Sequence, residues 1–429
     1  MFKPTCYDRP RLLDTVACPS KHPPTSSKKR NPRLPHAKYT APGETEALFD
    51  QASALVPALA AREAAATTAR EVPPETIEDY HRTGILRVLQ PRRFGGHQAP
   101  FDLFSRIVEK LAEGCASSAW VYAVLGEHQW IIGCMPEQAQ LDVWGDDPRA
   151  VASSSLAPRA TAERTTGGWR LAGKFPFSSG SSHAQWAIIG ARCPDAADNV
   201  ATRYLLVPMR EIEIIDDWHV LGLRATGSRT LLLRDVFVPT HRTVSLRDLY
   251  DGTTPGARVH PDYDLLRAPR GFLVPFSLAP VGFPLGRRAL ALTAQALRTR
   301  LSRGMRRMAD SEVVQLQLGE AGAAIEVATL VLHARREESM AILRSGRAIL
   351  DADILRNRRD ITFALHELRR AVDRLVEITG ARAVYDSDPL QMLVRDIQAI
   401  MTHYTVNRQA AIVPYGRMLL GLSPEAGEA

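Results

Sequence analysis

The amino-acid sequence predicts an α+β fold in which a helical domain, an antiparallel β-domain and a four-helix bundle follow one another along 429 residues. Three observations predict this order. Apolar residues recur at helical spacing up to about residue 149, short alternating runs replace them up to about residue 250, and long helical periodicities return from residue 285. A chain of this length can bury two or three hydrophobic cores.

Residues 1–40 are expected to form a disordered basic tail. They contain nine Lys or Arg against Asp8 and Asp14, so this segment alone accounts for the net charge of +7. It is rich in Pro, Ser and Lys, lacks hydrophobic periodicity and has no apolar core of the length that a secretory signal needs. The basic and acidic residues that follow balance each other. The sequence therefore indicates no basic surface for a nucleic acid.

Residues 41–149 are predicted to form the N-terminal helical domain. Pro74-Glu75-Thr76-Ile77 opens a helix that ends near Gly84. The stretch from Phe101 to Ile132 carries apolar residues at helical spacing and is expected to form two helices.

Residues 150–250 are predicted to form the antiparallel β-domain. Short alternating runs, separated by Gly, Pro, Asn and Asp, occupy residues 169–171, 186–189 and 204–207. A Gly-rich turn at residues 222–228 leads into a further alternating run at residues 230–238, which Pro239 closes. This pattern is typical of a half-buried strand.

The C-terminal domain follows a loop or connection at residues 251–284. Residues 285–429 are predicted to form an antiparallel four-helix bundle, because short connectors join four long helical periodicities. These periodicities cover residues 288–302, 311–344, 351–379 and 389–420.

Several classes of protein are excluded by what the sequence lacks. The five cysteines, at positions 6, 18, 115, 134 and 193, form no CxxC pair and no metal-ligand spacing, which favours reduced thiols in a cytoplasmic protein. No run approaches the ~18 apolar residues of a membrane span. The sequence contains no nicotinamide fingerprint, no phosphate-binding loop of the Walker type and no metal-ligand cluster, so we expect no metal site.

The segment from Gly222 to Pro239, with Gly-Leu-Arg-Ala-Thr-Gly-Ser at its start and Val-Phe-Val-Pro at its end, resembles a signature of a known superfamily. That signature belongs to the middle β-domain of the acyl-CoA dehydrogenase superfamily. The order of helices, β-domain and helical bundle is also that of the acyl-CoA dehydrogenase fold, and the resemblance covers the chain from about residue 44 onward. It implies that the protein binds a flavin.

Within this superfamily, the stretch from Arg395 to Asn407 favours an oxygenase over a dehydrogenase. A dehydrogenase uses a glutamate to remove a proton next to a thioester, and no Glu lies between Glu377 and Glu425. The stretch instead resembles the helix of reduced-flavin-dependent monooxygenases that act on hydroxyphenylacetate and steroid phenols. That resemblance places His403 beside the flavin, where it stabilises the C4a-hydroperoxide, with Asn407 in the same stretch.

The stretch from Ser117 to His128 resembles a helix that contributes two site residues in these oxygenases. It implies that Trp120 lies near the flavin and that His128 interacts with the phenolic oxygen of the substrate. An imidazole with a pKa near neutrality is suited to deprotonating a phenol, which makes the ring more electron-rich. The alternative is that Trp120 is a core aromatic and His128 caps a helix end.

Serines on two predicted strands resemble flavin-contacting positions of the family. Residues 174–186 are similar to the strand and turn that hold the N5 and O4 edge of the flavin, and either Ser178 or Ser179 is the candidate. Spacing favours Ser179 as the residue that protects N5. On an earlier run, Ser153 and Ser154 match another flavin-contacting stretch.

Arg303 begins a segment, residues 303–315, that resembles the superfamily's Arg-x-x-Phe-Gly … Gln helix start. That segment touches the cofactor phosphates, often from a neighbouring subunit, and a guanidinium suits a phosphate. The Phe-Gly pair is missing here, so a surface arginine is the alternative.

Together these resemblances imply the oxygenase component of a two-component flavin monooxygenase. It would use reduced flavin (FMNH2 or FADH2) and O2 to hydroxylate a phenolic small molecule, with the flavin supplied by a separate NAD(P)H:flavin reductase. Family members are commonly homotetramers. Alternatives are an N-hydroxylating relative, a relative that oxygenates sulfur heterocycles or indoles, a true acyl-CoA dehydrogenase, and a non-catalytic binding module on the same fold.

Overall fold

The computed structural model describes residues 39–194 and 200–424. All but the last two residues of the predicted basic tail lie outside these ranges, so the disorder of that tail stays a prediction.

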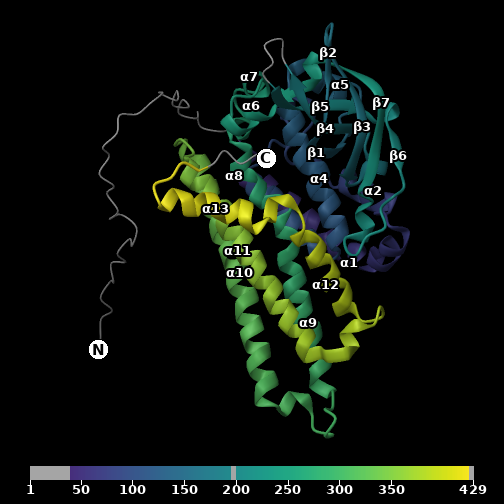
Figure 1. Cartoon of the computed structure of the whole chain (residues 1–429), viewed down its shortest axis with the longest axis vertical. Coiled ribbons are helices and arrows are strands. Elements are labelled where there is room, and N and C mark those ends of the chain that lie inside the picture. Colours follow the sequence, from purple (N-terminus) through teal and green to yellow (C-terminus); the bar gives the residue numbers. More distant parts are fainter. Residues whose placement is uncertain (1–38, 195–199, 425–429) are drawn as a thin grey trace. The chain divides into compact units, whose positions relative to one another are not determined.

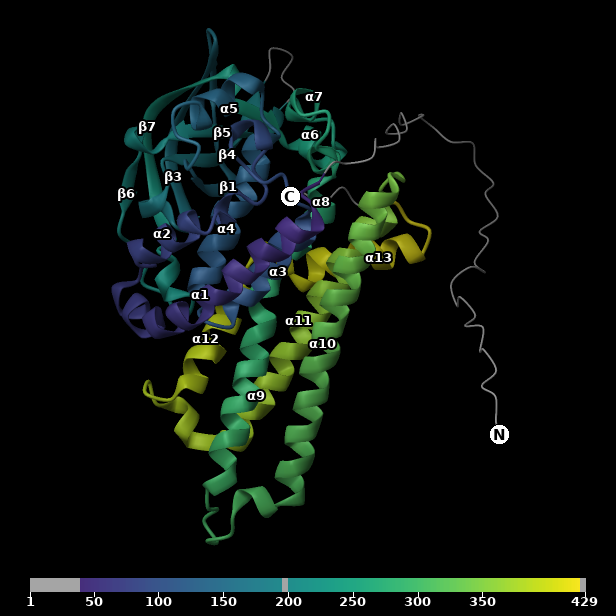
Figure 2. The same ribbon diagram turned by 180° about the vertical axis from the view of Figure 1, so that it is seen from behind.

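The N-terminal part of the described chain is helical, as the sequence predicts. Helix α2 begins at Pro74 and ends at Arg82, and α3 and α4 are the two pieces expected between Phe101 and Ile132. Every residue of α4 except Val124 is buried, because this helix is surrounded by other elements. Seen from behind, α1 and α3 lie beside each other and α3 meets α9 (Figure 2). The helices are α1 (Pro42–Ala69), α2 (Pro74–Arg82), α3 (Phe101–Ala112), α4 (Ala116–Gly133) and α5 (Glu137–Trp144).

The middle of the chain forms two four-stranded sheets with an apolar core between them (Figure 1). The strand order is β1-β4-β5-β8 in one sheet and β2-β3-β7-β6 in the other. The run expected at residues 230–238 is the centre of β7, which pairs antiparallel with β3. One pair departs from the antiparallel prediction, because β1 and β4 run parallel. The strands are β1 (Ala152–Thr161), β2 (Glu163–Thr165), β3 (Gly168–Ser178), β4 (Trp186–Pro194), β5 (Val200–Pro208), β6 (Glu213–Ile215), β7 (Arg229–Pro239) and β8 (Thr243–Ser245).

Residues 251–284, predicted as a loop or connection, fold into a series of short, buried helical turns. Helix α6 (Leu246–Asp251) leads into this range, which includes α7 (Gly256–Val259) and α8 (Arg270–Leu273). Apolar side chains such as Phe272, Leu273 and Phe276 are buried here and join the main hydrophobic core. Such a segment can enter the interior because its backbone groups bond within each short turn.

Long helices follow in the C-terminal part, and α9, α10 and α11 pack against one another (Figure 1). They are α9 (Gly282–Thr299), α10 (Glu312–Ser345) and α11 (Asp351–Thr379). The fourth predicted helix is two helices, α12 (Pro389–Met401) and α13 (Arg408–Leu419), with a 3-10 turn at Tyr404–Val406 between them.

His403 and Asn407 cause this break. Both residues have extended backbone conformations, and the side chain of each accepts a hydrogen bond from a backbone N–H of the turn or helix that follows. These bonds satisfy amide groups at the two new helix starts, so the interruption leaves few backbone groups without partners. The prediction that His403 belongs to a continuous helix is therefore wrong.

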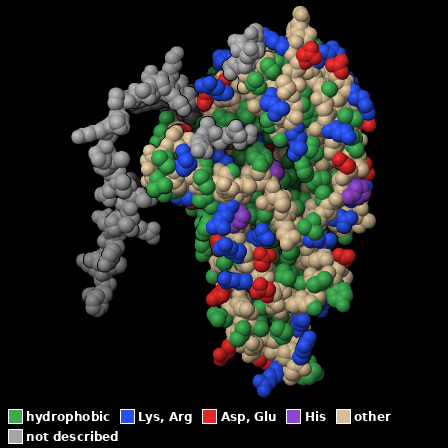
Figure 3. All heavy atoms as spheres, viewed as in Figure 1, with side chains coloured by type: hydrophobic (Ala, Val, Ile, Leu, Met, Phe, Trp, Pro, Cys, Tyr) green, Lys and Arg blue, Asp and Glu red, His purple; other side chains and the backbone are tan. Residues whose placement is uncertain are grey.

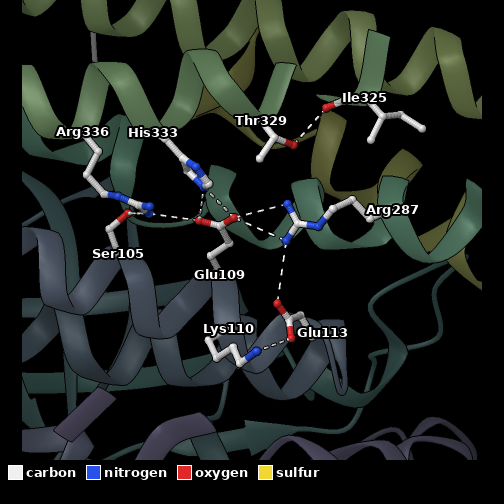
Figure 4. Close-up of polar contacts among 9 residues, drawn as sticks. All are labelled: Ser105, Glu109, Lys110, Glu113, Arg287, Ile325, Thr329, His333 and Arg336. Carbon is white, nitrogen blue, oxygen red and sulfur yellow. Dashed lines mark hydrogen bonds and ion pairs between the residues drawn. The ribbon is translucent and has the colours of Figure 1, made fainter. Parts of the chain in front are cut away.

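A buried carboxylate ties the N-terminal helices to the bundle (Figure 4). Glu109 of α3 pairs with His333 at 2.9 Å and Arg336 at 3.1 Å, both on α10, and with Arg287 of α9 at 3.4 Å. Burial alone would raise the pKa of Glu109, but the bond to His333 and the charges of Arg336, His333 and Arg287 lower it to about 2. The carboxylate is therefore ionised at neutral pH and holds α3 against α9 and α10.

Three further features concern only residues 39–194 and 200–424. No helix in these ranges is both long enough and apolar enough to cross a membrane. No group of three or more His, Cys, Asp or Glu side chains gathers there as a metal site would require. Cys115, Cys134 and Cys193 are free thiols, while the other two cysteines lie outside the described residues.

Candidate active site

Trp120 and His403 meet where the N-terminal helices face the break between α12 and α13. Their ring centroids are 5.3 Å apart and their planes are inclined at 81°, an edge-to-face contact. Trp120 is buried in α4, and His403 also packs against the ring of Tyr404 at 4.7 Å. Trp120 belongs to the N-terminal helical part and His403 to the C-terminal helical part of the chain.

Ser179 joins this pair from the β-domain. The indole Nε1 of Trp120 donates a hydrogen bond to Ser179 Oγ at 3.2 Å. Ser179 follows β3 directly, and Gly180 next to it has φ 66°, in the left-handed region. A Cβ at Gly180 would lie 3.0 Å from Val121 of α4, so glycine allows the turn to approach that helix closely.

Two further hydroxyl groups, those of Ser228 and Thr226, follow Ser179 in a row of hydrogen bonds that begins at Trp120. Ser179 Oγ lies 2.7 Å from Ser228 Oγ, and Ser228 Oγ lies 2.6 Å from Thr226 Oγ1. Thr226 Oγ1 donates to the carbonyl oxygen of Leu223 at 2.9 Å. All three hydroxyl-bearing side chains are buried. The Gly-rich turn that the sequence marks as a signature therefore extends into the site through Thr226 and Ser228.

His128 lies in α4 and is held by the first strand of the β-domain. Its Nδ1 is 2.7 Å from the carbonyl oxygen of Ala152. Because a carbonyl only accepts, Nδ1 carries the proton and Nε2 carries the lone pair. Burial and, to a smaller extent, the nearby charge of Arg270 lower the pKa of His128 to about 4, although its bond to Ala152 opposes the shift. His128 is therefore neutral near pH 7, and its Nε2 is a hydrogen-bond acceptor.

His403 has the opposite tautomer. Its Nδ1 accepts the backbone N–H of Thr405 at 3.4 Å and lies 2.8 Å from Thr405 Oγ1. Because a backbone N–H only donates, Nδ1 is unprotonated and Nε2 carries the proton. Burial, followed by the charge of Arg270, lowers the pKa of His403 to about 4. The site thus contains one neutral histidine that accepts at Nε2 and one that donates there.

Arg270 is the cation common to both histidines, and the sequence did not identify it. It is buried at the start of α8, where its guanidinium donates to the Tyr404 hydroxyl at 3.3 Å and lies 3.8 Å from Glu127. It also lies over the ring of Tyr204, 5.7 Å from the ring centroid. Its Nε has no hydrogen-bond partner among the described residues. No local pattern distinguishes Arg270 from other arginines, because its partners are far away in the sequence.

Comparison with known proteins reveals a family. The family model described as acyl-CoA dehydrogenase, C-terminal domain, matches residues 276–408. The oxygenase component of an FADH2-dependent resorcinol hydroxylase from Rhizobium sp. (strain MTP-10005) is 36% identical over 367 residues, covering 83% of this chain and 90% of that protein. The chain belongs to the oxygenase components of flavin-dependent monooxygenases.

Other members resemble this oxygenase over nearly their whole length. The oxygenase subunit HsaA of a flavin-dependent monooxygenase from Mycobacterium tuberculosis (strain ATCC 25618 / H37Rv) is 33% identical, covering 86% of this chain and 94% of that one. The crystal structure of HsaA from M. tuberculosis superposes with a TM-score of 0.82 at 31% identity, covering 89% of this chain and 99% of that chain. XiaF from Streptomyces sp., in complex with FADH2 and glycerol, has a TM-score of 0.80 at 28% identity, covering 90% and 98% of the two chains. Membership favours the oxygenase interpretation over the dehydrogenase.

Two of the candidate serines of this oxygenase pair with each other. Ser178 donates to Ser153 at 3.0 Å, and both side chains are buried where β3 faces β1. Ser178 thus points to a different partner from Ser179, as alternation along an extended segment requires. Ser154, the next residue on β1, is only partly buried.

Two other candidates do not join the site within one chain. Asn407 is exposed, and its side chain accepts the backbone N–H of Ala410 as the cap of α13. Arg303 is exposed in the connection between α9 and α10, at the end of the bundle away from the strands (Figure 1). Arg303 is therefore a surface arginine in this chain, which is the alternative expected from the sequence because the Phe-Gly pair is missing.

Proposed function

We propose that this chain is the oxygenase component of a two-component monooxygenase that uses reduced flavin and O2 to hydroxylate a phenolic small molecule. The single observation that carries the proposal is the pair of neutral histidines with opposite tautomers near Arg270, one of which, His403, contacts Trp120. The names of the relatives support it, since a resorcinol hydroxylase and a p-hydroxyphenylacetate hydroxylase are among them. Reduced FMN and reduced FAD are both candidate cofactors.

The residues present fit a flavin. A flavin ring carries N–H and C=O groups along one edge, so it needs acceptors and donors on one side and apolar contact on its faces. Ser179 has an unused lone pair, His403 presents an N–H, and the Nε of Arg270 is buried without a partner among the described residues. Trp120 supplies an aromatic wall next to them. When bound and reduced, the flavin would supply the activation of O2.

Each of the proposed catalytic residues has a role that its geometry supports. We assign His403 as the hydrogen-bond donor that holds the reacting edge of the cofactor, and Ser179 as the acceptor beside it. His128, with a free lone pair at Nε2, accepts the phenolic proton of the substrate. Its pKa of about 4 departs from the near-neutral value that the sequence led us to expect, so we assign this transfer to the moment when the ring is oxygenated and the phenolic proton becomes strongly acidic. Removal of this proton makes the aromatic ring more nucleophilic, and the burial of His128 keeps water away from its free nitrogen.

The remaining candidates take supporting roles in this proposal. Ser153 and Ser178 fix the end of β3 next to Ser179 through their mutual hydrogen bond, and Ser154 stays a candidate cofactor contact on β1. Asn407 caps α13 and so holds the chain that leads away from His403. Arg303 reaches a cofactor phosphate only from a neighbouring copy of the chain.

A direct assay tests the proposed activity. Chemically reduced FMN or FAD is mixed with the purified protein in air-saturated buffer, with panels of phenols, amines and sulfur heterocycles, and both hydroxylated product and H2O2 are quantified. We expect product from a phenol in near-stoichiometric yield per flavin. Product from amines or sulfur heterocycles alone would assign the protein to N- or S-oxygenation. H2O2 without product across a broad panel would contradict the proposal.

We further propose that a separate NAD(P)H:flavin reductase supplies the reduced flavin. The relatives are named as oxygenase components, which supports a second component. A purified chain without reductase should then oxidise no NADH or NADPH in the presence of flavin, and addition of a flavin reductase should restore product formation. The three free thiols of the described chain support a cytoplasmic location.

We also propose a homotetramer built on the bundle. Helix α10 exposes large apolar side chains in two pairs, each three residues apart: Val313 (64%) with Leu316 (63%), and Val327 (59%) with Leu330 (57%). The step of eleven residues from Leu316 to Val327 is close to three helical turns, so both pairs lie on one face of α10. Hydrophobic side chains also reach the surface of the bundle in Figure 3. Light scattering should report four copies for the natural chain and a smaller assembly for a Val327→Glu/Leu330→Glu variant. A monomer at micromolar concentration would contradict this assembly.

A further inference from the structure

The row of hydroxyl groups behind Ser179 has a defined direction. At one end the indole Nε1 of Trp120 can only donate a hydrogen bond, and at the other end the carbonyl oxygen of Leu223 can only accept one. Between them lie the hydroxyls of Ser179, Ser228 and Thr226, at successive distances of 3.2, 2.7, 2.6 and 2.9 Å from one end of the row to the other.

One proton per hydroxyl determines every bond in this row. Thr226 gives its proton to Leu223 O, so it must accept in its contact with Ser228. Ser228 has then used its proton and must accept from Ser179. Ser179 donates to Ser228 and accepts from Trp120, which leaves it a single lone pair and no proton for another partner.

The carbonyl that terminates the row is itself held in place. Leu223 has φ 51°, in the left-handed region, and its N–H donates to the buried carboxyl of Asp396 on α12 at 2.6 Å. A Cβ at the neighbouring Gly222 would lie 2.0 Å from the carbonyl oxygen of Arg395, so this turn lies directly on α12. The acceptor end of the row is therefore fixed by the same helix that leads to His403.

We propose that Ser228 and Thr226 are positioning residues that make Ser179 a hydrogen-bond acceptor only, so that the site selects the reduced form of the flavin over the oxidised form. The inference rests on the function proposed above. Reduced flavin carries a hydrogen on N5, which needs an acceptor. Oxidised flavin has no hydrogen on N5 and needs a donor there. Because the proton of Ser179 is committed to Ser228, the row matches the first form and opposes the second.

The strength of hydrogen bonds limits how strongly the row can favour reduced over oxidised flavin. For Ser179 to donate to a ligand, all three hydroxyls would have to rotate and Leu223 O would lose its bond from Thr226. One neutral hydrogen bond changes an affinity by about tenfold or less. We therefore expect the row to contribute about a tenfold preference for reduced flavin, in addition to any preference from other contacts.

Two substitutions interrupt the row without touching Ser179. Ser228→Ala removes the acceptor of the Ser179 proton. Thr226→Val removes the acceptor of the Ser228 proton at almost constant side-chain volume, which allows Ser228 to donate to Ser179. In both variants Ser179 becomes able to donate. Thr226→Ser keeps the hydroxyl and is the conservative rescue.

The test is the ratio of two dissociation constants, measured by anaerobic titration with FMN and with FAD in oxidised and reduced forms. We expect Ser228→Ala and Thr226→Val to bind oxidised flavin more tightly, so that the ratio of oxidised to reduced dissociation constants falls by about tenfold. Thr226→Ser should retain the ratio of the natural protein. A row that only packs the turn against α4 would weaken both forms equally.

Three outcomes distinguish a failure of the directional row from a failure of the proposed function. Unchanged ratios in Ser228→Ala and Thr226→Val, with circular dichroism showing folded protein, would overturn the directional row. A fall in the ratio for Thr226→Ser as large as that for Thr226→Val would also overturn it, because packing would then be the cause. If the natural protein binds neither form of flavin, the proposed function itself is wrong. The indole N–H signal of Trp120 in ¹⁵N NMR reports whether each variant keeps the Trp120–Ser179 bond.

Discussion

The imidazole of His403 meets the indole of Trp120 edge to face, with their ring centroids 5.3 Å apart. Trp120 lies on a buried helix of the N-terminal domain, and His403 lies in the gap between the last two helices. Through its N–H, Trp120 also holds Ser179 from the β-domain. All three parts of the chain thus meet at one indole ring, so the site exists only when they are assembled.

Substitution of His403 by alanine should uncouple flavin oxidation from hydroxylation. The variant loses the Nε2–H donor, so we expect reduced flavin to be consumed at a similar rate but product per flavin to fall about tenfold or more, with H2O2 in its place. Rapid mixing with O2 followed by product and peroxide assays measures this. His241→Ala is a matched control, because that histidine pairs with Asp142 instead. Unchanged coupling would remove His403 from the reaction.

Substitution of His128 by alanine should make the reaction depend on the ionisation of the phenol. The pKa of His128 is about 4, so its base form is present throughout pH 6–9 and the natural enzyme should show a flat rate in that range. Without the base, the rate should rise by about tenfold per pH unit as the phenol ionises by itself. Product formation measured against pH distinguishes the two profiles. A flat profile in the variant would show that His128 is not the base.

Substitution of Asp396 by asparagine should stabilise the protein at alkaline pH. Burial raises the pKa of Asp396 to about 7, whereas the unfolded carboxyl titrates near its usual 3.8. The folded state therefore favours the protonated carboxyl, and its stability falls as the pH rises from about 4 to about 7. Asparagine keeps an oxygen for the Leu223 N–H and has no charge to bury.

The difference in unfolding free energy between the Asp396→Asn variant and the natural protein should grow by about 2 kcal/mol between pH 5 and pH 8. Urea unfolding at the two pH values measures it. Asp386→Asn, at a carboxylate that is almost fully exposed, should show no such growth. An equal difference at both pH values would mean that Asp396 is already ionised in the folded protein at pH 5.

Substitution of Glu109 by glutamine should destabilise the contact between α3 and the bundle. The change leaves the largely buried guanidinium of Arg336, whose side chain is 12% exposed, without its countercharge, which costs about 3 kcal/mol at pH 7. Since the pKa of Glu109 is lowered from 4.5 to about 2, its contribution is fully present above about pH 4.5 and is lost as the pH falls toward 2.

Chemical denaturation at pH 7 and at pH 3 measures this effect. We expect the destabilisation by Glu109→Gln to shrink at the lower pH. Glu113→Gln removes a carboxylate from the same cluster that is more than a third exposed, and it should cost less than about 1 kcal/mol. A Glu109 variant as stable as the natural protein would show that packing alone holds α3 to α9 and α10.

Local patterns predicted much of this molecule. The order of helices, strands and helices follows from hydrophobic periodicity, which each segment carries by itself, and α2 starts at Pro74 because proline favours the first turn of a helix. The candidates Trp120, Ser179 and His403 came from resemblance, and the structure brings their side chains into contact, while their roles stay predictions.

Other features depended on contacts that no local pattern contains. The last helix breaks at His403 although apolar residues continue on both sides, because His403 and Asn407 use their own side chains to cap the new helix starts. The sequence does not distinguish Ser178 and Ser153 from Ser179 as candidate flavin contacts. In the structure, β1 lies against β3, so Ser178 and Ser153 form a hydrogen bond with each other.

The sequence by itself determined the succession of secondary structure and the absence of the dehydrogenase glutamate. Only the tertiary structure decided which nitrogen of His128 and of His403 carries the proton, that Arg270 lies near both histidines, and which way the hydroxyl row behind Ser179 points. The reason is physical. Hydrophobic period is a property of neighbouring residues, whereas the direction of a hydrogen bond and the pKa of a buried group are set by partners that folding brings from distant parts of the chain.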